Sequence, residues 1–458
     1  MKKINIKIIA AGIFLSSAIF FSALGFSVSR LTSPKNTRII TDTETRELLE
    51  LLDGLYPERT QNVTQLPYKT IPADLDIYAG SAILIDQETG NILYEKNADM
   101  EIPPASMTKL VEMYVVYEAV RNGETSLDDV VNLPPQSWSV NLPSDASRMF
   151  LGEGQKVTLR ELLLGLAIAS GNDASIAVAN HVCGDMDSFV QRMNDLVKKL
   201  GMTKTHFVES SGYSEKNITT AREFAGFCRI YLRDFPESLS NYHAKEKLVY
   251  PEKKNLPPAQ RNNPEIKSIT QYNTNKLLGV LEGCDGLKTG YIDESGYNIA
   301  VTVRRGNRRF VSITMKGPGT GSIQGNKYRV LDGTALMEFA FAKFAPYKDN
   351  DNRSFVVGCA GTKEKSIRLI PATQTSFSVP FITGTSPEDA ASKVIVKAEF
   401  PPYHYGEIQC GQEMGRLTYS LEGKTLMTVP LVADRKNPAR GFPGRIWGKI
   451  VYSSANLF

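Results

Sequence analysis

Two strand-like patterns of apolar and polar positions lie far apart in the chain, one in residues 81–95 and one in residues 297–315. Residues 81–95 contain two β-rich runs on either side of a Glu-Thr-Gly-Asn turn, which is the pattern of a hairpin. Residues 297–304 and 309–315 repeat this pattern around a tight Arg-Gly-Asn-Arg turn. These runs predict the strands of one sheet, although a long segment separates them.

The segment between the two hairpins has the apolar spacing of helices. Thr158 and Glu161 form a capping box at the start of one of them. The stretches with helical character are 107–121, 162–168, 174–182, 187–200 and, after the second hairpin, 329–344. A sheet of early and late strands around a helical middle is an α+β fold, which we assign to residues 78–347.

Two segments outside this domain have simpler patterns. Residues 30–77 are mostly polar with scattered prolines and one short helix candidate, 42–52, so we expect a linker or arm. In 350–440, short strands alternate with glycine and proline turns and no helical period occurs. This pattern predicts a small all-β domain.

The last segment, 441–458, has the pattern of a short amphipathic helix. Arg445 and Lys449 lie off a helical face that is formed by Ile446, Trp447, Ile450, Val451 and Leu457. Two interpretations stay open. The segment could contact a membrane surface, or it could be a last helix packed on the β domain.

The N-terminus has the layout of an export signal. Lys2, Lys3 and Lys7 precede an uncharged stretch, and Ala23-Leu24-Gly25 offers the small residues that a signal peptidase reads. We therefore expect a signal peptide within 1–29. The apolar run, at roughly 20 residues, is also long enough for an uncleaved membrane anchor. Either way the protein is exported and works in the periplasm or at the outer face of the cytoplasmic membrane.

Composition narrows the possible partners of this chain. Its 458 residues carry 53 Lys and Arg against 49 Asp and Glu, without a long basic run, so nucleic acid is an unexpected partner. A hydrophobic share of 42% is that of a globular protein. The five cysteines form no C-x-x-C pair, and only four histidines exist. We therefore expect no metal site and no cofactor.

The first candidate for chemistry is Ser106 with Lys109, at the start of a predicted helix. A spacing of three residues puts both side chains on one helical face. A lysine in a desolvated site can lose its proton and act as the base that activates a hydroxyl. Taken alone, this four-residue pattern is usually ordinary helix surface.

Two more polar clusters follow in the order of one known kind of active site. Ser170 and Asn172 lie between two apolar helices, where a hydroxyl and an amide could face a cleft, although a plain turn gives the same pattern. Lys288, Thr289 and Gly290 lie on a predicted strand, where they offer a cation, a hydroxyl and an open backbone. The order and spacing of all three clusters make the combination specific.

These motifs resemble those of the penicillin-binding protein and serine β-lactamase superfamily, whose motifs are S-x-x-K, S-x-N and K-T-G. The fuller strings, Pro-Ala-Ser-Met-Thr-Lys109, Ala-Ser-Gly-Asn-Asp-Ala174 and Asp-Gly-Leu-Lys-Thr-Gly290, are similar to those of low-molecular-mass D-alanyl-D-alanine carboxypeptidases of peptidase family S11. The resemblance implies a β-lactamase/transpeptidase-like α+β domain followed by the small β domain. It also implies removal of the terminal D-Ala from peptidoglycan stem peptides, with β-lactam antibiotics as covalent inhibitors.

The resemblance also implies a role for each motif residue. Ser106 would be the acylated nucleophile and Lys109 its base, while Ser170 relays protons and Asn172 holds the substrate amide. The residues expected to bind the substrate are Lys288, Thr289, Gly290, Tyr291 and Arg329. Among them, Lys288, Thr289 and Arg329 would meet the terminal carboxylate, and the backbone amides of Ser106 and Tyr291 would form the oxyanion hole.

Departures from the family pattern leave related functions open. Ile292 stands where many relatives carry Thr or Ser, which removes one hydrogen bond to the substrate. A Gly-Pro-Gly-Thr-Gly run, 317–321, lacks the Lys-Ser/Thr of a phosphate loop, so we interpret it as a flexible loop. The alternatives are a D,D-endopeptidase, a β-lactamase without a Glu-x-x-Leu-Asn loop, and a non-catalytic cell-wall scaffold or β-lactam sensor.

Overall fold

The computed structural model describes residues 6–32, 38–69, 71, 73–349, 353–373, 375–381 and 385–455. They form two compact units. The first, here called the motif unit, comprises Asn62–Tyr347 and Phe377–Ala390. The second, here called the β unit, comprises the described residues of Met1–Gln61, Lys348–Ser376 and Ala391–Phe458.

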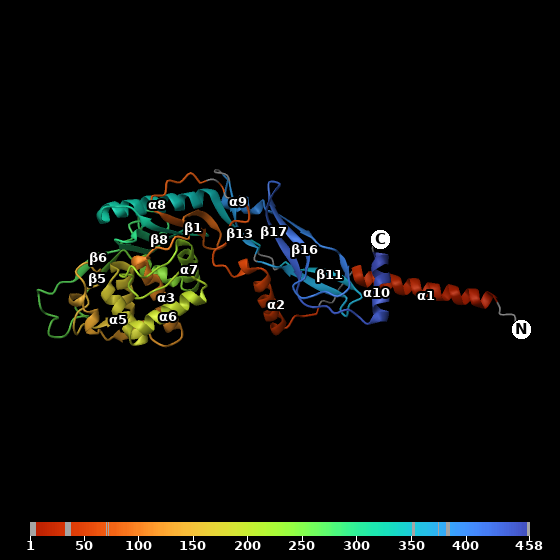
Figure 1. The fold of residues 1–458 in the computed structure, drawn as a ribbon, viewed down its shortest axis with the longest axis horizontal. Helices are drawn as coiled ribbons and strands as arrows, with labels where there is room; N and C mark the ends of the chain where they lie inside the picture. The colour runs from red at the N-terminus through yellow and green to blue at the C-terminus, as the bar shows by residue number, and fades with distance from the viewer. Residues whose placement is uncertain are drawn as a thin grey trace. The chain divides into compact units, whose positions relative to one another are not determined.

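A five-stranded antiparallel sheet forms the centre of the motif unit, in the order β2-β1-β9-β8-β7 (Figure 1). Its strands are β1 (Ser81–Asp86), β2 (Ile92–Lys96), β7 (Cys284–Ile292), β8 (Gly296–Arg305) and β9 (Arg308–Gly317). Both predicted hairpins are confirmed. The β1–β9 pairing joins the early hairpin to the late one, as the α+β assignment requires.

Both faces of this sheet are buried because helices cover each of them. Ile83 and Ile85 belong to one core together with the helical middle of the chain, and Ala82 and Leu84 belong to a second core with the helix α8 (Gly321–Lys343). Successive side chains of a strand point to opposite faces, so β1 reads as a continuous apolar run. The sheet is thus the middle layer of three.

The helical layer confirms most of the predicted helices. It contains α3 (Thr108–Arg121), α4 (Leu159–Leu164), α5 (Asn172–Cys183), α6 (Met186–Lys199) and α7 (Ala221–Asp234). The capping box of Thr158 and Glu161 is present at the start of α4. The segment expected as one helix, 162–168, instead changes after α4 into a π-helical turn, Gly165–Ala169.

The closing helix is longer than its apolar pattern predicts. We expected it to begin at Arg329, whereas α8 begins at Gly321, two helical turns earlier. Gly317 ends β9, so the loop expected over 317–321 is shorter than the glycine pattern suggests. The early turns of α8 are rich in polar residues and glycine, so their apolar spacing gave no helical signal.

Short elements complete the motif unit. Two-stranded pairs are β3 (Val130–Val131) with β4 (Val157–Thr158), β5 (Lys247–Tyr250) with β6 (Ile269–Tyr272), and β10 (Phe344–Lys348) with β13 (Ser376–Pro380). Short helical turns are Ala105–Met107, Pro135–Ser137, Ser139–Asn141 and Leu239–His243. In β13, Ser378 donates from its hydroxyl to the Asp86 carboxylate at 3.0 Å. A strand from the segment expected as β domain therefore lies in the motif unit.

A six-stranded sheet forms the β unit, in the order β14-β16-β17-β12-β11-β15. Its strands are β11 (Phe355–Ala360), β12 (Ser366–Pro371), β14 (Ile395–Glu399), β15 (Tyr403–Tyr405), β16 (Glu413–Leu421) and β17 (Lys424–Ala433). The expectation that 350–440 contains no helix is wrong in one place, because α9 (Pro387–Ser392) is a six-residue helix. A helix that short has no room for an apolar period.

Three helices from the two ends of the chain belong to the β unit. They are α1 (Ile6–Thr32), α2 (Asp42–Leu55) and α10 (Phe442–Ala455), and Pro57–Arg59 adds a short turn. Leu31 of α1 and Val451 of α10 are buried in one small apolar cluster, which agrees with α10 as a last helix packed on the β domain. Leu457, which we placed on the apolar face of that helix, lies outside the described residues.

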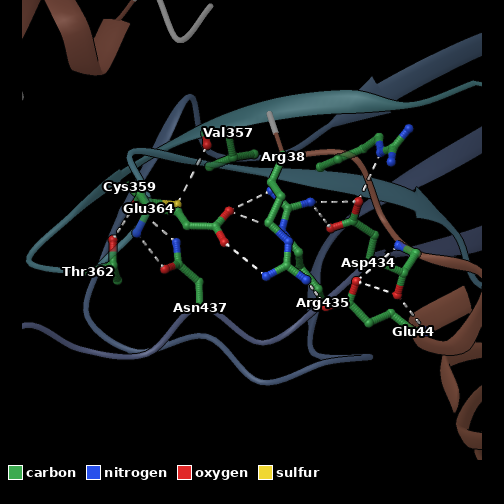
Figure 2. Close-up of polar contacts among 11 residues, drawn as sticks. Arg38, Glu44, Val357, Cys359, Thr362, Glu364, Asp434, Arg435 and Asn437 are labelled. Carbon is green, nitrogen blue, oxygen red and sulfur yellow. Dashed lines mark hydrogen bonds and ion pairs between the residues drawn. The ribbon is translucent and has the colours of Figure 1, made fainter. Parts of the chain in front are cut away.

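An ion-pair network ties the arm before α2 to this sheet (Figure 2). Arg435 is buried and donates to Glu364 at 2.8 Å and to Asp434 at 3.0 Å. Arg38 pairs with Glu44 of α2 and lies 4.0 Å from Glu364. The residues that we expected as a linker or arm thus divide, since those up to Gln61 belong to the β unit and those from Asn62 to the motif unit.

Candidate active site

Ser106 and Lys109 lie where a short turn, Ala105–Met107, runs into α3. Nearly every residue of α3 is buried, because the helix passes through the apolar core of the helical layer. Lys109 is fully buried as well, and its Nζ lies 3.2 Å from Ser106 Oγ. The spacing of three residues therefore brings the hydroxyl and the amine into contact.

Two further oxygens hold the Lys109 amine. Its Nζ donates to Asn172 Oδ1 at 2.8 Å and to the Ser211 carbonyl at 2.5 Å. A neutral amine has two N–H bonds and one lone pair, so these two acceptors direct the lone pair at Ser106. Burial lowers the pKa of Lys109 to about 8, although the charges of Glu112, Glu209 and Asp173 act to raise it.

The π-helical turn at Gly165–Ala169 positions the second motif. Ser170 follows this turn with φ +57, in the left-handed region, and Asn172 begins α5. Asp173, which follows Asn172, holds the start of α5 in place. Its carboxylate accepts hydrogen bonds from the backbone amides of Met149, Phe150 and Leu151. π-Helical turns are frequent at functional sites, since they displace the residues that follow them.

Lys288 on β7 links the third motif to the second one through a contact with Ser170. Its Nζ lies 3.1 Å from Ser170 Oγ and 2.9 Å from the Thr289 carbonyl, and the side chain is almost fully buried. Burial lowers the pKa of Lys288 well below its usual value, and the nearby charges of Lys109 and Arg329 lower it further. Each of the two lysines therefore contacts one motif serine, Lys109 Ser106 and Lys288 Ser170.

The other residues of the K-T-G motif lie at the edge of this site. Thr289 shares a 2.6 Å hydrogen bond between hydroxyls with Thr274. A Cβ on Gly290 would lie 2.5 Å from the Pro104 carbonyl oxygen and 3.0 Å from the Ser106 nitrogen. Glycine is therefore required for the close approach of β7 to Ser106, a packing reason that our sequence argument did not include.

Tyr291 and Ile292 lie beyond this approach at the end of β7. Tyr291 is half-exposed, and its ring lies 4.4 Å from that of Tyr297 between centroids. Ile292 pairs with Gly296 at the start of β8. They are consecutive residues of β7, so their side chains point to opposite faces of the sheet.

Arg329 reaches the same strand from α8. It is buried, donates to the Gly290 carbonyl and to Asn326 at 2.8 Å, and lies over the Tyr297 ring at 4.9 Å. Its Nε is buried without a hydrogen-bond partner among the described residues. Burial lowers the pKa of Arg329 to about 10, so the guanidinium stays charged at neutral pH.

Sequence reasoning missed the segment Glu209–Gly212, which supplies the Ser211 carbonyl. The Glu209 carboxylate accepts from the backbone amides of Ser211 and Gly212, both at 2.7 Å. Gly212 has φ +80, and a Cβ there would lie 1.9 Å from the Ala105 carbonyl oxygen. A functional backbone carbonyl has no sequence motif. The sequence of this segment, Ser-Ser-Gly, indicates only a turn.

A second missed residue is Glu112, one turn after Lys109 on α3. It is fully buried and accepts from the Ser175 hydroxyl at 2.9 Å, while its other oxygen has no hydrogen-bond partner among the described residues. Burial raises the pKa of Glu112 to about 8. A glutamate within an apolar helical run was a detectable signal that we did not use.

Comparison with known proteins gives a consistent result for this geometry. The family model described as D-alanyl-D-alanine carboxypeptidase, peptidase S11, matches residues 68–319. The chain is 31% identical over 368 residues to D-alanyl-D-alanine carboxypeptidase DacF of Bacillus subtilis, covering 80% of this chain and 87% of that one. It is 30% identical over 383 residues to DacA of Escherichia coli K12, covering 82% and 88% of the two chains.

Solved structures give the same result for the fold. Penicillin-binding protein 5 from Haemophilus influenzae superposes with a TM-score of 0.66 and 26% identity, over 80% of this chain and all of that one. D-alanyl-D-alanine carboxypeptidase DacD from Francisella tularensis gives 0.64 and 25%, over 81% and 97%. The likeness extends over most of the length of each protein.

Proposed function

Because the chain belongs to the peptidase S11 family of D-alanyl-D-alanine carboxypeptidases, we propose that Ser106 is its nucleophile and Lys109 the base that activates it. The protein is a serine-type hydrolase that removes a terminal D-Ala. One observation carries the assignment of roles. Lys109 is fully buried, and its Nζ contacts Ser106 Oγ as well as Asn172 Oδ1 and the Ser211 carbonyl. In the neutral amine, these two acceptors would take both N–H bonds and leave the lone pair for the Ser106 proton.

Acylation then needs no residue outside the site. Lys109 accepts the hydroxyl proton while Ser106 Oγ forms a bond to the carbonyl carbon of the penultimate D-Ala. The backbone amides of Ser106 and Tyr291 stabilise the oxyanion that develops. The C–N bond breaks, and the terminal D-Ala leaves as an amine that takes up a proton.

Ser170 is positioned to deliver that proton. Its hydroxyl lies 3.1 Å from the Lys288 Nζ, and Lys109 is linked to the same motif through Asn172. A cation beside the hydroxyl favours donation of its proton to the leaving amine. Ser170 regains its proton from protonated Lys109, which is thereby neutral again. Water then attacks the ester carbonyl and gives a proton to Lys109, which returns it to Ser106 Oγ as the C–O bond breaks.

The terminal carboxylate of the substrate would bind beside the cations at β7. Lys288, Thr289 and Arg329 lie along or behind β7, and Arg329 contacts the Gly290 carbonyl. A carboxylate that replaces water beside them forms charge-assisted hydrogen bonds. This favours peptidoglycan stem peptides that end in D-Ala-D-Ala, and β-lactams, which present an amide and a carboxylate in a similar arrangement.

We place this activity outside the cytoplasm. The helix segment Ile13–Thr32 is long and apolar enough to cross a membrane, and a signal sequence near the N-terminus has the same properties. An exported enzyme meets the assembled peptidoglycan of the cell wall, which lies outside the cytoplasmic membrane. Contact with the membrane surface would keep it near that substrate.

The central test is covalent labelling of the full chain by fluorescent penicillin. The label should attach to Ser106, and Ser106→Ala should abolish both the label and the release of D-Ala from diacetyl-Lys-D-Ala-D-Ala. Ser312→Ala is a matched control, because it removes a buried hydroxyl of the same unit that has no hydrogen-bond partner among the described residues. Labelling that survives in Ser106→Ala, or mass added to another residue, would contradict the assignment.

A further inference from the structure

A hollow of about 220 Å³ in the β unit is lined by residues from the end of α1, the end of β11 and α10. Figure 1 labels these three elements. Its walls combine apolar residues with three basic ones, Arg30, Lys365 and Arg440. The hollow is smaller than the ~300–1,000 Å³ typical of drug-sized ligands. Its size suits one compact polar group, and its charge suits an anion.

The three cations of this hollow are not neutralised within the described chain. No carboxylate oxygen of a described residue lies within 4.0 Å of Arg30, Lys365 or Arg440. Other basic residues of the same unit do have such partners, as Arg368 pairs with Asp434 at 2.9 Å and Arg416 with Glu399 at 2.8 Å. The hollow therefore gathers three cations that no carboxylate of the described residues neutralises.

The concentration of positive charge affects the pKa of Lys365. Desolvation lowers the pKa of its amine, and the charges of Arg30 and Arg440 lower it further. Arg30 also lies over the ring of Phe26, with its guanidinium carbon 4.2 Å from the centroid. A bound anion would relieve the repulsion among the three basic groups.

The elements around the hollow indicate where that anion comes from. The apolar segment Ile13–Thr32 of α1 leads to it, and the side chains of Phe14 and Phe21 on that segment are largely exposed. Trp447 of α10 lines the hollow and contacts Phe20, with ring centroids 5.5 Å apart. Tryptophan and basic residues at the end of an apolar span are typical of the membrane–water interface.

We propose that this hollow binds the phosphate of an anionic membrane lipid. An apolar span inserted in the bilayer would hold the hollow at headgroup level, where Arg30, Lys365 and Arg440 contact the phosphate. Phe26, Ser27, Arg30 and Leu31 all follow the expected cleavage position near Gly25. All three cations are therefore retained in a processed chain too.

The test compares lipid binding by the full chain and two charge-matched variants in neutral detergent. Lys365→Gln with Arg440→Gln removes two cations of the hollow. Lys363→Gln with Lys449→Gln removes two exposed cations of the same unit that do not line it. Native mass spectrometry measures retention of phosphatidylglycerol and of phosphatidylcholine, with inorganic phosphate as competitor.

The original chain should retain phosphatidylglycerol over phosphatidylcholine. Each hollow substitution should weaken this roughly fivefold and the pair roughly 25-fold, the effect expected for basic residues at an anionic surface. The control pair should bind as the original chain does. Urea unfolding followed by Trp447 fluorescence, in a Trp138→Phe background, checks that the β unit of each variant is folded.

Three outcomes would overturn the proposal. Equal retention of the two lipids by the original chain would mean that the hollow does not recognise an anionic headgroup. Equal loss in the control pair would assign the effect to general surface charge. Displacement of phosphatidylglycerol by millimolar inorganic phosphate, with the same dependence on Lys365 and Arg440, would make this a site for free phosphate. If the double variant does not fold, the two single variants decide the same question.

Discussion

Buried cations occur in both units, but their partners differ. In the β unit, Arg435 is neutralised by Asp434 and Glu364 (Figure 2). In the motif unit, Lys109 and Lys288 contact only uncharged oxygens, and no carboxylate of the described residues lies within 4.0 Å of either amine.

This difference separates a structural cation from a reactive one. A carboxylate at contact distance favours the charged form of a base, so it would keep a lysine protonated. Lys109 has neutral partners instead, and burial is then free to lower its pKa to about 8. The site gives up the stability of an ion pair and gains an amine that can accept a proton.

Among the changes that test this comparison, removal of the Lys109 amine should have the largest effect on the rate of acylation. Lys109→Ala should slow penicillin acylation by about 10²- to 10⁴-fold, because the activating base is lost. Lys109→Arg should not restore the rate, since a guanidinium stays protonated. The acylation rate constant measures both, and rescue by arginine would mean that Lys109 acts only as a positive charge.

Breaking the ion pair of the β unit should instead affect stability alone. Arg435→Met removes the cation that Asp434 and Glu364 share, while Asp434 keeps Arg368 as a partner at 2.9 Å. The loss of these charge-assisted hydrogen bonds should lower the free energy of unfolding of that unit by about 1 to 3 kcal/mol. Trp138 and Trp447 are the two tryptophans of the chain, so a Trp138→Phe background lets Trp447 report on urea unfolding of the β unit.

Acylation of Ser106 should keep its original rate in Arg435→Met, because the site lies in the other unit. Neutralising the other carboxylate with Glu364→Gln should recover part of the lost stability, because Glu364 loses its 2.8 Å partner in this variant. A variant as stable as the original chain would show that the buried pair contributes nothing to the fold.

Arg329 provides a sharper test because its charge is expected to meet the substrate. Arg329→Ala should weaken catalysis on a peptide with a free carboxylate by on the order of 1.5 to 3 kcal/mol, roughly 10- to 150-fold. An amidated peptide should lose much less. Arg329→Lys keeps a charge and should fall between them, as measured by kcat/KM on both peptides.

Thr289→Val tests the same pocket without changing its charge. It removes the hydroxyl that bonds to Thr274, and it should also affect the free carboxylate more than the amide. Equal losses on both peptides for Arg329 and Thr289 variants would place these residues outside the carboxylate pocket.

The smallest expected effect concerns the pH dependence of acylation. The reactive form of Lys109 is neutral, so the rate should rise as pH increases through its pKa of about 8. The charge of Glu112 acts to raise that pKa, so Glu112→Gln should move the rising limb to lower pH. Glu118→Gln, on the exposed side of the same helix, is the matched control. A limb that moves to higher pH would contradict this assignment.

The local pattern of the sequence was enough for much of the fold and for the three motifs. The hairpins and the Thr158 capping box depend on neighbouring residues, so they could be predicted and are present. The spacing of Ser106 and Lys109 depends only on one helical turn. The start of α8 could not be predicted from its apolar spacing, because its first turns are polar and rich in glycine.

What the sequence by itself determined is which chemical groups the site contains and in what order they occur. Only the tertiary structure decided their state. The Ser211 carbonyl, Asn172 and the buried helix α3 come together from distant segments, and their packing removes water from Lys109. A lowered pKa and a directed lone pair arise from that exclusion of water and from the placement of those two acceptors, neither of which a linear spacing records.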